Sequence, residues 1–271
     1  MPSNGFVLRN GDDRNIISLP NAPWCTTFSV GTGDRNDLQI KNFAENKDGT
    51  KFELFWQGEK ICSIHWQMPG EYNARNLAMS FLSSVLTQAI CEGKEILHTN
   101  PFSGFKLPDY SSCKGVKRRQ EILVDQDEFT VISDFAHHPT AIAGTLESLR
   151  ARWANRKIIA CFEPRSNTAV TNIFQDRFAD SLSIADEVLL GAVHRGDKIP
   201  VAQRIDTQAM IDRIKNSGRE GCSFSKNSDL GDYLKSKNNL NQAVLTVFFS
   251  NGSFDGEIEK FVQYVTPKDL S

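Results

Sequence analysis

Three short runs of polar residues each follow an apolar stretch of the kind that forms a buried strand. They are Asp134-Phe-Ala-His-His-Pro139, Glu163-Pro-Arg-Ser-Asn-Thr168 and Ser250-Asn-Gly-Ser-Phe-Asp-Gly256. In a parallel sheet the carboxyl ends of the strands lie at one edge, where the loops that follow them share a crevice. We therefore expect the three runs to converge on one polar pocket.

The first run offers groups that can exchange protons or accept hydrogen bonds. Asp134 ends the strand and His137 follows within three residues. Histidine changes its charge near neutral pH, so His137 and Asp134 are candidates for contact with a polar ligand. The alternative is that this aspartate, the histidines and Pro139 only build a turn and the start of a helix.

The second run offers a cation beside neutral hydrogen-bonding groups. Arg165 can bind a carboxylate or a phosphate through two parallel N–H groups. Ser166, Asn167 and Thr168 add donors and acceptors next to it. The alternative is a helix N-cap that follows a surface arginine.

In the third run glycines alternate with polar residues before an expected helix. Gly252 and Gly256 allow the backbone to approach a ligand closely, with Asn251 beside them. The N-terminus of the helix presents free N–H groups to an anion. The run lacks the G-x-G-x-x-G spacing and does not open the domain, so it does not predict a nicotinamide site.

Two further segments carry candidate ligand-binding residues. Three cations, Lys117, Arg118 and Arg119, stand just before an expected strand, and the alternative is a solvated basic run. Asn73 and Asn76 lie three residues apart at the start of an expected helix, hence on one face. A side-chain amide both donates and accepts, so the pair could recognise the edge of an adenine, although asparagine there is often only a cap.

The elements that must position these residues are strands alternating with helices. From residue 121 onward the expected strands are 121–124, 129–132, 157–162, 187–190 and 243–249, and the expected helices are 140–153, 170–185, 208–216 and 257–265. This alternation predicts an α/β fold, a Rossmann-like and mostly parallel sheet with helices on both faces.

The chain before residue 95 has a different pattern. Short β-like runs include a hairpin of 52–56 with 61–66, and a helix over 72–91 should end at Gly93. Residues 95–113 contain prolines, a glycine and no sustained period, which indicates a short helix plus a linker. We therefore expect two domains, 1–113 and 114–271.

The composition is that of a globular protein with no strong charge bias. The chain has 271 residues, is 39% apolar and 24% charged, and carries a formal net charge of −2. This balance gives no reason to expect nucleic acid or a membrane as partner. No apolar run is long enough to span a bilayer and the first residues do not form a signal peptide, so we expect a cytoplasmic protein. The six cysteines are widely and irregularly spaced, which favours reduced, buried thiols over a disulfide or zinc site.

Taken together, these segments resemble the Mur ligase family. Residues 115–121 are similar to the G-V-x-x-R-x-E segment that begins its C-terminal domain, and 134–139 to its D-[YF]-[AG]-H-x-P motif. Residues 70–76 resemble the G-x-H-N-x-x-N helix start of the central domain, with Tyr72 where histidine is usual. That departure leaves both asparagines intact.

Two segments narrow the resemblance within the family. Residues 163–168 and 250–256 are similar to the E-P-R-S-N-T and S-N-G-x-F-x-G segments of its murein peptide ligases. The five segments occur in the family's order and spacing over nearly the whole chain. The branch that adds L-alanine to UDP-N-acetylmuramate carries different residues at both places and is kept as an alternative.

The resemblance implies a ligase that uses ATP and Mg²⁺ in peptidoglycan recycling. ATP would phosphorylate the carboxylate of UDP-N-acetylmuramate, and the amine of the murein tripeptide L-Ala-γ-D-Glu-meso-diaminopimelate would attack the acyl phosphate. By position, the implied nucleotide-binding residues are Asn73, Asn76, Arg119, Asp134 and His137, of which the last three are also the implied catalytic residues. The implied peptide-binding residues are Arg165, Ser166, Asn167, Asn251 and Gly252.

No G-x-x-x-x-G-K-[ST] phosphate loop occurs in these residues. Residues 5–13 resemble a family strand, N-G-x-x-x-x-N-x-D-D, that follows that loop. We therefore expect a chain that starts within the central domain, lacks the UDP-binding domain and the upstream magnesium ligands, and is inactive alone. The alternatives are a non-catalytic murein-peptide-binding module, one half of a split ligase whose N-terminal half is supplied separately, and an unrelated α/β nucleotide-binding enzyme.

Overall fold

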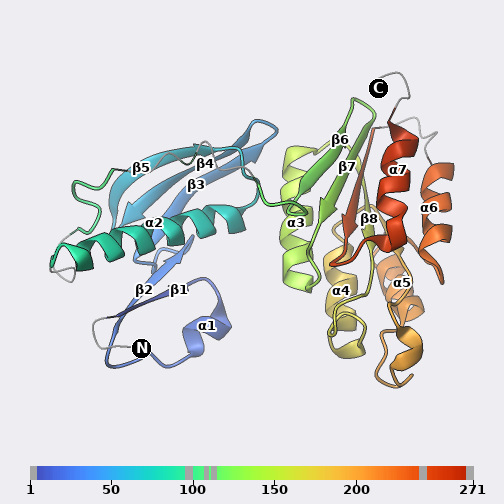
Figure 1. Cartoon of the computed structure of the whole chain (residues 1–271), viewed down its shortest axis with the longest axis horizontal. Helices are drawn as coiled ribbons and strands as arrows, with labels where there is room; N and C mark the ends of the chain where they lie inside the picture. Colours follow the sequence, from blue (N-terminus) through green and yellow to red (C-terminus); the bar gives the residue numbers. More distant parts are fainter. Residues whose placement is uncertain (1–4, 95–99, 107–109, 111–114, 238–242, 267–271) are drawn as a thin grey trace. The chain divides into compact units, whose positions relative to one another are not determined.

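A computed structural model describes residues 5–94, 100–106, 110, 115–237 and 243–266 (Figure 1). The chain divides into two compact units, Met1–Lys114 and Gly115–Ser271. Each unit has its own sheet and its own hydrophobic core. Much of the short helix expected within 95–113 lies outside the described residues.

The first unit is a five-stranded sheet covered by one long helix (Figure 1). The strands are in the order β1-β2-β3-β4-β5, the first three parallel and the last three antiparallel. The elements are β1 (Phe6–Asn10), α1 (Arg14–Ser18), β2 (Thr26–Gly31), β3 (Leu38–Asn46), β4 (Gly49–Trp56), β5 (Glu59–Trp66) and α2 (Glu71–Cys91).

The β4–β5 hairpin confirms the expected turn. Gln57 and Gly58 have φ of 47° and 90°, the left-handed pair that matches the twist of a two-residue hairpin. Strand β3 was not expected, because Asn42, with φ of 54°, lies within a bulge between Lys41 and Ala44 that breaks the alternation of apolar residues.

Helix α2 buries most of the expected apolar stripe and ends where it should. Gly93 has φ of 66°, and Lys94 N donates to Ala89 O at 3.0 Å, so the left-handed residue closes the last turn. Ile90, on the last turn of the helix, is 46% exposed.

The second unit confirms the predicted α/β fold. Its sheet has the order β10-β9-β8-β11-β7-β6, and every neighbouring pair is parallel except β6 with β7. The strands are β6 (Glu121–Asp125), β7 (Phe129–Asp134), β8 (Lys157–Phe162), β9 (Glu187–Leu190), β10 (Glu220–Ser223) and β11 (Val244–Phe249). The helices are α3 (Pro139–Arg152), α4 (Gln175–Leu182), α5 (Thr207–Asn216), α6 (Asn227–Ser236) and α7 (Glu257–Val265), with the short 3-10 turns η1 (Asn172–Phe174), η2 (Gly196–Lys198) and η3 (Phe254–Gly256).

Strand β8 shows how the helices cover both faces of this sheet. Ile158 and Phe162 face a core shared with α3, α4 and α5, and the Phe162 ring stacks on Phe178 at 4.9 Å between ring centroids. Ile159 and Cys161 face the opposite core, shared with α6 and α7. Alternate side chains of a strand point to opposite faces, so a strand in the middle of this sheet must be apolar throughout.

The predicted helix over 170–185 is wrong at its beginning. The chain forms η1 and then α4, because Asn172 N donates to Gln203 O, outside any helix, at 2.9 Å. Ile173, within the helix that we expected, is 69% exposed. Strand β10 was not expected, because it is short and buries only Gly221. Helix α6 was not expected either, because it contains Gly231, a residue that weakens a helical pattern. Glycine occupies this position because a Cβ there would collide with the Glu257 side chain.

Candidate functional site

The carboxyl ends of three adjacent strands meet at one level of the second sheet. Phe249 of β11 is in register with Asp134 of β7 on one side and with Phe162 of β8 on the other. Beyond that level the main chains stay joined, since Ser250 N donates to Asp134 O at 3.1 Å and Glu163 N to Phe249 O at 3.0 Å. The three polar runs therefore start side by side.

A cavity of about 720 Å³ lies beside these strand ends. The residues that we singled out and that line it are His137, Arg165, Ser166, Asn167, Thr168 and Asn251. The other lining residues are Val170, Thr171, His194, Arg195, Lys198 and Ile199. Arg119, Asp134 and Gly252 are not among them.

The lining of this cavity is cationic. Arg165, Arg195 and Lys198 line it together with two histidines, and none of its lining residues is an aspartate or a glutamate. Within the described part of the chain, Arg195 and Lys198 form no ion pair, and the ion pair of Arg165 is with Glu163, at 3.4 Å. A cavity with three cations and no carboxylate in its lining fits an anionic ligand.

The side-chain carbonyl oxygen of Asn251 is a hydrogen-bond acceptor without a donor among the described residues. This atom, Oδ1, is buried. A buried carbonyl oxygen without a hydrogen bond is costly, so Asn251 Oδ1 is available to accept a hydrogen bond from a ligand or a water molecule. An amide or an ammonium group would satisfy it.

His137 presents one ring nitrogen and uses the other. Its Nδ1 lies 2.9 Å from Phe135 O, where only a protonated nitrogen can donate, and its ring contacts that of Phe135 edge-on. The Nε2 atom takes no part in that bond, and His137 is one of the residues that line the cavity. His138 serves the helix instead: its Nδ1 accepts from Thr140 N at 3.3 Å and caps α3.

Asp134 is placed inside the domain, with only 2% of its surface exposed. Its Oδ2 accepts from Gln120 N at 2.8 Å and its Oδ1 from Ala136 N at 2.7 Å. Burial raises the pKa of Asp134, and the two backbone N–H groups, Arg119 and Thr145 oppose that rise. In this structure Asp134 positions the segments on either side of it and offers no free oxygen to a ligand.

Arg119 is exposed, and its guanidinium lies 5.2 Å from the centroid of the Phe135 ring. It can present its N–H groups to an anion outside the cavity. Gln120, the next residue, is tied to Asp134, which fixes the backbone beneath Arg119.

Glu163 is the hub of a buried network beneath the cavity. It is 2% exposed, and its Oε2 accepts hydrogen bonds from Ser250 Oγ and from Phe254 N. Its Oε1 accepts from Asn227 Nδ2 at 3.2 Å and from Arg165 Nη1 at 3.4 Å. One carboxylate therefore fixes the ends of β8 and β11 and the start of α6 relative to one another.

The turn after β11 has an unusual backbone. Phe254, Asp255 and Gly256 have φ of 49°, 54° and 84°, a left-handed run that L side chains disfavour. Phe254 is fully buried and packs edge-on against Phe248, which holds this turn in place. A strained turn beside a cavity is typical of a functional site.

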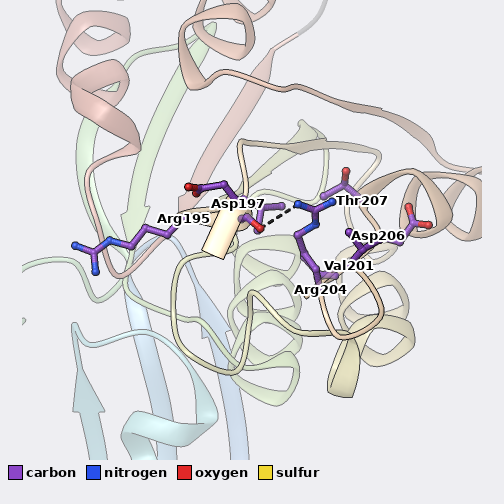
Figure 2. Close-up of a pocket in the computed structure, with 9 residues that line it drawn as sticks. Arg195, Asp197, Val201, Arg204, Asp206 and Thr207 are labelled. Atoms are coloured by element: carbon purple, nitrogen blue, oxygen red, sulfur yellow. Dashed lines mark hydrogen bonds between the residues drawn. The ribbon is translucent and has the colours of Figure 1, made fainter. Parts of the chain in front are cut away.

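The loop after β9 is the wall of the cavity that sequence reasoning missed. His194 N donates to Pro164 O at 2.9 Å, which ties the loop to the second polar run. Arg204 Nη1 donates to Gly196 O at 2.9 Å, and Figure 2 shows the Arg195 side chain extending away from Arg204. Arg195 itself has φ of 51°. The signal was available, since a charged run, His194-Arg-Gly-Asp-Lys198, follows a fourth apolar strand.

A second cavity, of about 570 Å³, lies behind this loop and is the one drawn in Figure 2. Its charged lining is mixed: Arg195 and Arg204 face it together with Asp197 and Asp206. Asp206 is already engaged, because its Oδ1 caps α5 by accepting from the backbone N–H groups of the first turn. This cavity therefore lacks the uniform positive charge of the larger one.

In the first unit the two predicted asparagines differ in exposure. Asn73 is buried and its Nδ2 donates to Pro69 O at 2.6 Å, so it fixes the start of α2. Asn76 is exposed and free to present its amide. Only Asn76 is placed to read the edge of a base without a change in the structure.

Asp12 joins the strand ends of the first unit to α2. It accepts from Thr32 N at 2.7 Å and from Asn36 Nδ2 at 2.9 Å, and Arg75 Nη2 lies 3.3 Å from it. Burial raises the pKa of Asp12, but the hydrogen bonds from Thr32, Gly33 and Asn36 outweigh burial and hold the pKa below its usual value. The carboxylate is therefore ionised and fully engaged at neutral pH.

Among the described residues no group of three or more histidine, cysteine, aspartate or glutamate side chains could hold a metal ion. In the same part of the chain no helix has both the length and the apolar character to cross a membrane. Five cysteines in that part are free thiols, and they are not all buried as expected, since Cys91 is exposed. Burial raises the pKa of Cys161 well above its usual value.

Two family models match the chain, and they match it in the order of its two units. The Mur ligase middle domain matches residues 1–84, and the Mur ligase glutamate ligase domain matches residues 118–247. The chain belongs to the Mur ligase family. Its second unit, which holds the cation-lined cavity, is thus the family's C-terminal domain, and its first unit belongs to the middle domain of these ATP-dependent ligases.

Curated relatives agree with this family. The UDP-N-acetylmuramate–L-alanine ligase of Clostridium acetobutylicum is 29% identical over 248 residues, which are 91% of this chain and 51% of that protein. The corresponding ligase of Christiangramia forsetii is 28% identical over 232 residues, 86% of this chain and 47% of that protein. The chain spans about half the length of the curated relatives it matches.

Solved structures agree with the fold. A UDP-N-acetylmuramate–alanine ligase from Thermotoga maritima has a TM-score of 0.63 at 20% identity and covers 87% of this chain, which in turn covers 47% of it. A murein peptide ligase from Psychrobacter arcticus has a TM-score of 0.62 at 24% identity, with 97% and 52% covered. At these identities the Mur ligases share the fold of this chain.

Proposed function

We propose that this chain supplies the peptide-binding and part of the nucleotide-binding machinery of a ligase that joins murein tripeptide to UDP-N-acetylmuramate. The observation that carries the proposal is the cavity beside β7, β8 and β11, lined by Arg165, Arg195 and Lys198 without a carboxylate. The tripeptide L-Ala-γ-D-Glu-meso-diaminopimelate bears several carboxylates, and a cavity of about 720 Å³ has the size of a site for such a ligand.

The roles follow from the chemistry of the lining. Arg165 would bind a peptide carboxylate, supported by the Ser166 and Asn167 side chains. Asn251 Oδ1, which lacks a donor in the described structure, would accept from the peptide's ammonium or amide groups. We propose that Gly252 acts by its small size, which lets Arg165 lie against the main chain.

Amide formation in this family needs an activated carboxylate. ATP supplies the phosphoryl group that converts the muramoyl carboxylate to an acyl phosphate, and attack by the peptide amine expels inorganic phosphate as the amide bond forms and the amine loses a proton. We propose that exposed Arg119 neutralises phosphate charge, and that His137 Nε2 lies near the reacting groups. Asp134 would act indirectly by fixing the backbone below both residues.

The described residues provide only part of a site for the nucleotide. Exposed Asn76 can read the edge of an adenine, whereas the Asn73 Nδ2 is bonded to Pro69 O. The described residues contain no metal-binding cluster, so we assign no ligand to Mg²⁺ and route no step through it. We propose that the tripeptide site functions without those parts and that amide formation needs a phosphate loop and a UDP-binding domain in the same or another chain.

A second candidate function is the addition of L-alanine to UDP-N-acetylmuramate. It is favoured by the curated relatives, since those of Clostridium acetobutylicum and Christiangramia forsetii are L-alanine ligases. Alanine has one carboxylate and no need for three separate cations, which is why we prefer the tripeptide.

Isothermal titration of the full chain with the tripeptide and with L-alanine tests these alternatives. We expect micromolar binding of the tripeptide, weakened at least tenfold by Arg165→Leu and unchanged by Lys51→Leu, a control at an exposed residue of β4 in the first unit. Binding of L-alanine but not of the tripeptide would favour the second candidate. Binding of neither would refute the peptide-site proposal.

A further inference from the structure

Arg118, which does not line the cavity, contacts the loop that forms one of its walls. Its Nη2 atom donates to the carbonyl oxygens of both Ser250 and Gly252. These residues are 132 and 134 positions away in the sequence, so the contact joins the segment before β6 to the turn after β11. One guanidinium bonded to two nearby carbonyl groups fixes the curvature of the turn between them.

The backbone of Arg118 is held in place on both sides. Its N–H donates to Glu121 Oε2 at 2.8 Å, and its carbonyl oxygen accepts from Phe135 N at 2.6 Å. Its φ is 61°, in the left-handed region that glycine adopts without strain and an arginine does not. A long side chain at a position suited to glycine indicates that the side chain itself is needed there.

The same turn is held from below by the network of Glu163. Ser250 Oγ donates to Glu163 and accepts from Gly252 N, the latter at 2.7 Å. Arg118 therefore bonds to the carbonyl groups of the turn, whereas Glu163 and Ser250 bond to its N–H side. Removing the Arg118 side chain would therefore leave the carbonyl oxygens of Ser250 and Gly252 without this donor.

The position of this turn affects two side chains that line the cavity, those of Arg165 and Asn251. Gly252 lies directly against Arg165, so that an added Cβ would stand 2.5 Å from Arg165 Nε and 2.7 Å from its Cζ. The residue between the two bonded carbonyls is Asn251, whose side chain lines the cavity. A shift of this turn would therefore move two of the groups that face the ligand.

We infer that Arg118 is a positioning residue, which shapes the Asn251–Gly252 turn and through it the anion-binding side chain of Arg165. Its neighbour Arg119 is exposed, and both guanidinium groups lie against the Phe135 ring, at 5.3 and 5.2 Å from its centroid. The two adjacent arginines thus have different roles: half-buried Arg118 bonds to the turn, and Arg119 lies on the surface. The part of this inference that concerns the peptide rests on the proposed function, and the part that concerns the turn does not.

Amide hydrogen exchange of the full chain without ligand tests whether Arg118 fixes the Asn251–Gly252 turn. In Arg118→Gly we expect the amides of Gly252 and Phe254 to exchange at least tenfold faster than in the unaltered chain. Glycine suits the backbone at φ of 61°, so the domain should still fold, with an unfolding midpoint close to that of the unaltered chain. Arg118→Lys should give an intermediate increase because an ammonium lacks the planar fork.

Lys117→Ala is the matched control, since it removes one exposed cation beside Arg118 and should leave exchange unchanged. Titration with the tripeptide should show binding about tenfold weaker in Arg118→Gly, the effect of losing one charge-assisted interaction. Unchanged exchange at Gly252 and Phe254 would overturn the inference, and so would faster exchange with tripeptide affinity within twofold of the unaltered chain. If the unaltered chain binds no tripeptide, the proposed function fails, and the exchange data alone decide whether Arg118 holds the turn.

Discussion

Gly252 lies so close to the Arg165 side chain that no larger residue fits between them. A Cβ on Gly252 would stand 2.5 Å from Arg165 Nε and 2.7 Å from its Cζ, well inside van der Waals contact. The φ of Gly252 is not in the left-handed region, so the requirement for glycine here is the space taken by the guanidinium. The ligand-facing position of Arg165 thus depends on a main-chain position in another loop.

Gly252→Ala should displace Arg165 and weaken tripeptide binding by about tenfold, the effect of losing one charge-assisted contact. Isothermal titration measures the change. Gly144→Ala is the matched control, since a Cβ there meets nothing within 4 Å. Because Gly144 lies inside α3, that change should leave affinity intact and stabilise the domain by about 0.5–1 kcal/mol. Full affinity in Gly252→Ala would show that the ligand-binding position of Arg165 does not depend on its packing against Gly252.

Asp134→Ala should destabilise the second unit by about 1–3 kcal/mol. The change leaves the N–H groups of Gln120 and Ala136 buried without an acceptor. Urea unfolding followed by the fluorescence of Trp153, which is buried in this unit, measures the loss. A stability equal to that of the unaltered chain would mean that Asp134 does not fix these segments and would return it to the list of ligand-binding candidates.

The cap of α3 should make stability depend on pH. Burial, helped by the nearby charges of Arg177 and His137, lowers the pKa of His138 below its ordinary value of 6.5. As pH falls from 6.5 through the lowered pKa, the unfolded chain takes up the proton first, so stability falls over that window and is fully regained above it. His138→Asn keeps a cap that does not titrate. The difference in unfolding midpoint between the two proteins should therefore change as pH falls below 6.5, and a constant difference would contradict this role.

Salt should weaken tripeptide binding, because the cavity offers charges and its lining contains no carboxylate. Raising the salt concentration from about 0.1 to about 1 M shortens the screening length from about 10 to about 3 Å, and we expect a severalfold loss of affinity. In Arg195→Ala combined with Lys198→Ala the salt dependence should be smaller. Binding that does not respond to salt would indicate that hydrogen bonds and apolar contacts, and not these cations, hold the ligand.

The sequence patterns predicted most of what forms the second sheet. Its central strands are continuous apolar runs, and such runs can be recognised because β8 and β11 must be apolar on both faces. The edge strand β10 was missed because it is short and mostly uncovered, whereas β6 at the other edge was predicted. The start of α4 was misplaced because Asn172 bonds to Gln203, a long-range contact that no local pattern reveals.

The candidate site was predictable where function requires a distinctive residue after a strand. Arg165 and His137 were recognised in this way and line the cavity. Arg195 followed the same pattern after β9 and was overlooked, although it stands in the charged run 194–198. The role of Arg118 could not be predicted, because it depends on contact with residues more than 130 positions away.

A crystal structure of the full chain grown with the tripeptide tests the central claim most directly. We predict a peptide carboxylate within hydrogen-bonding distance of the Arg165 guanidinium and a peptide N–H facing Asn251 Oδ1, with Arg195 or Lys198 at a second carboxylate. A tripeptide bound elsewhere on the chain, or a cavity without peptide at saturating concentration, would contradict the account.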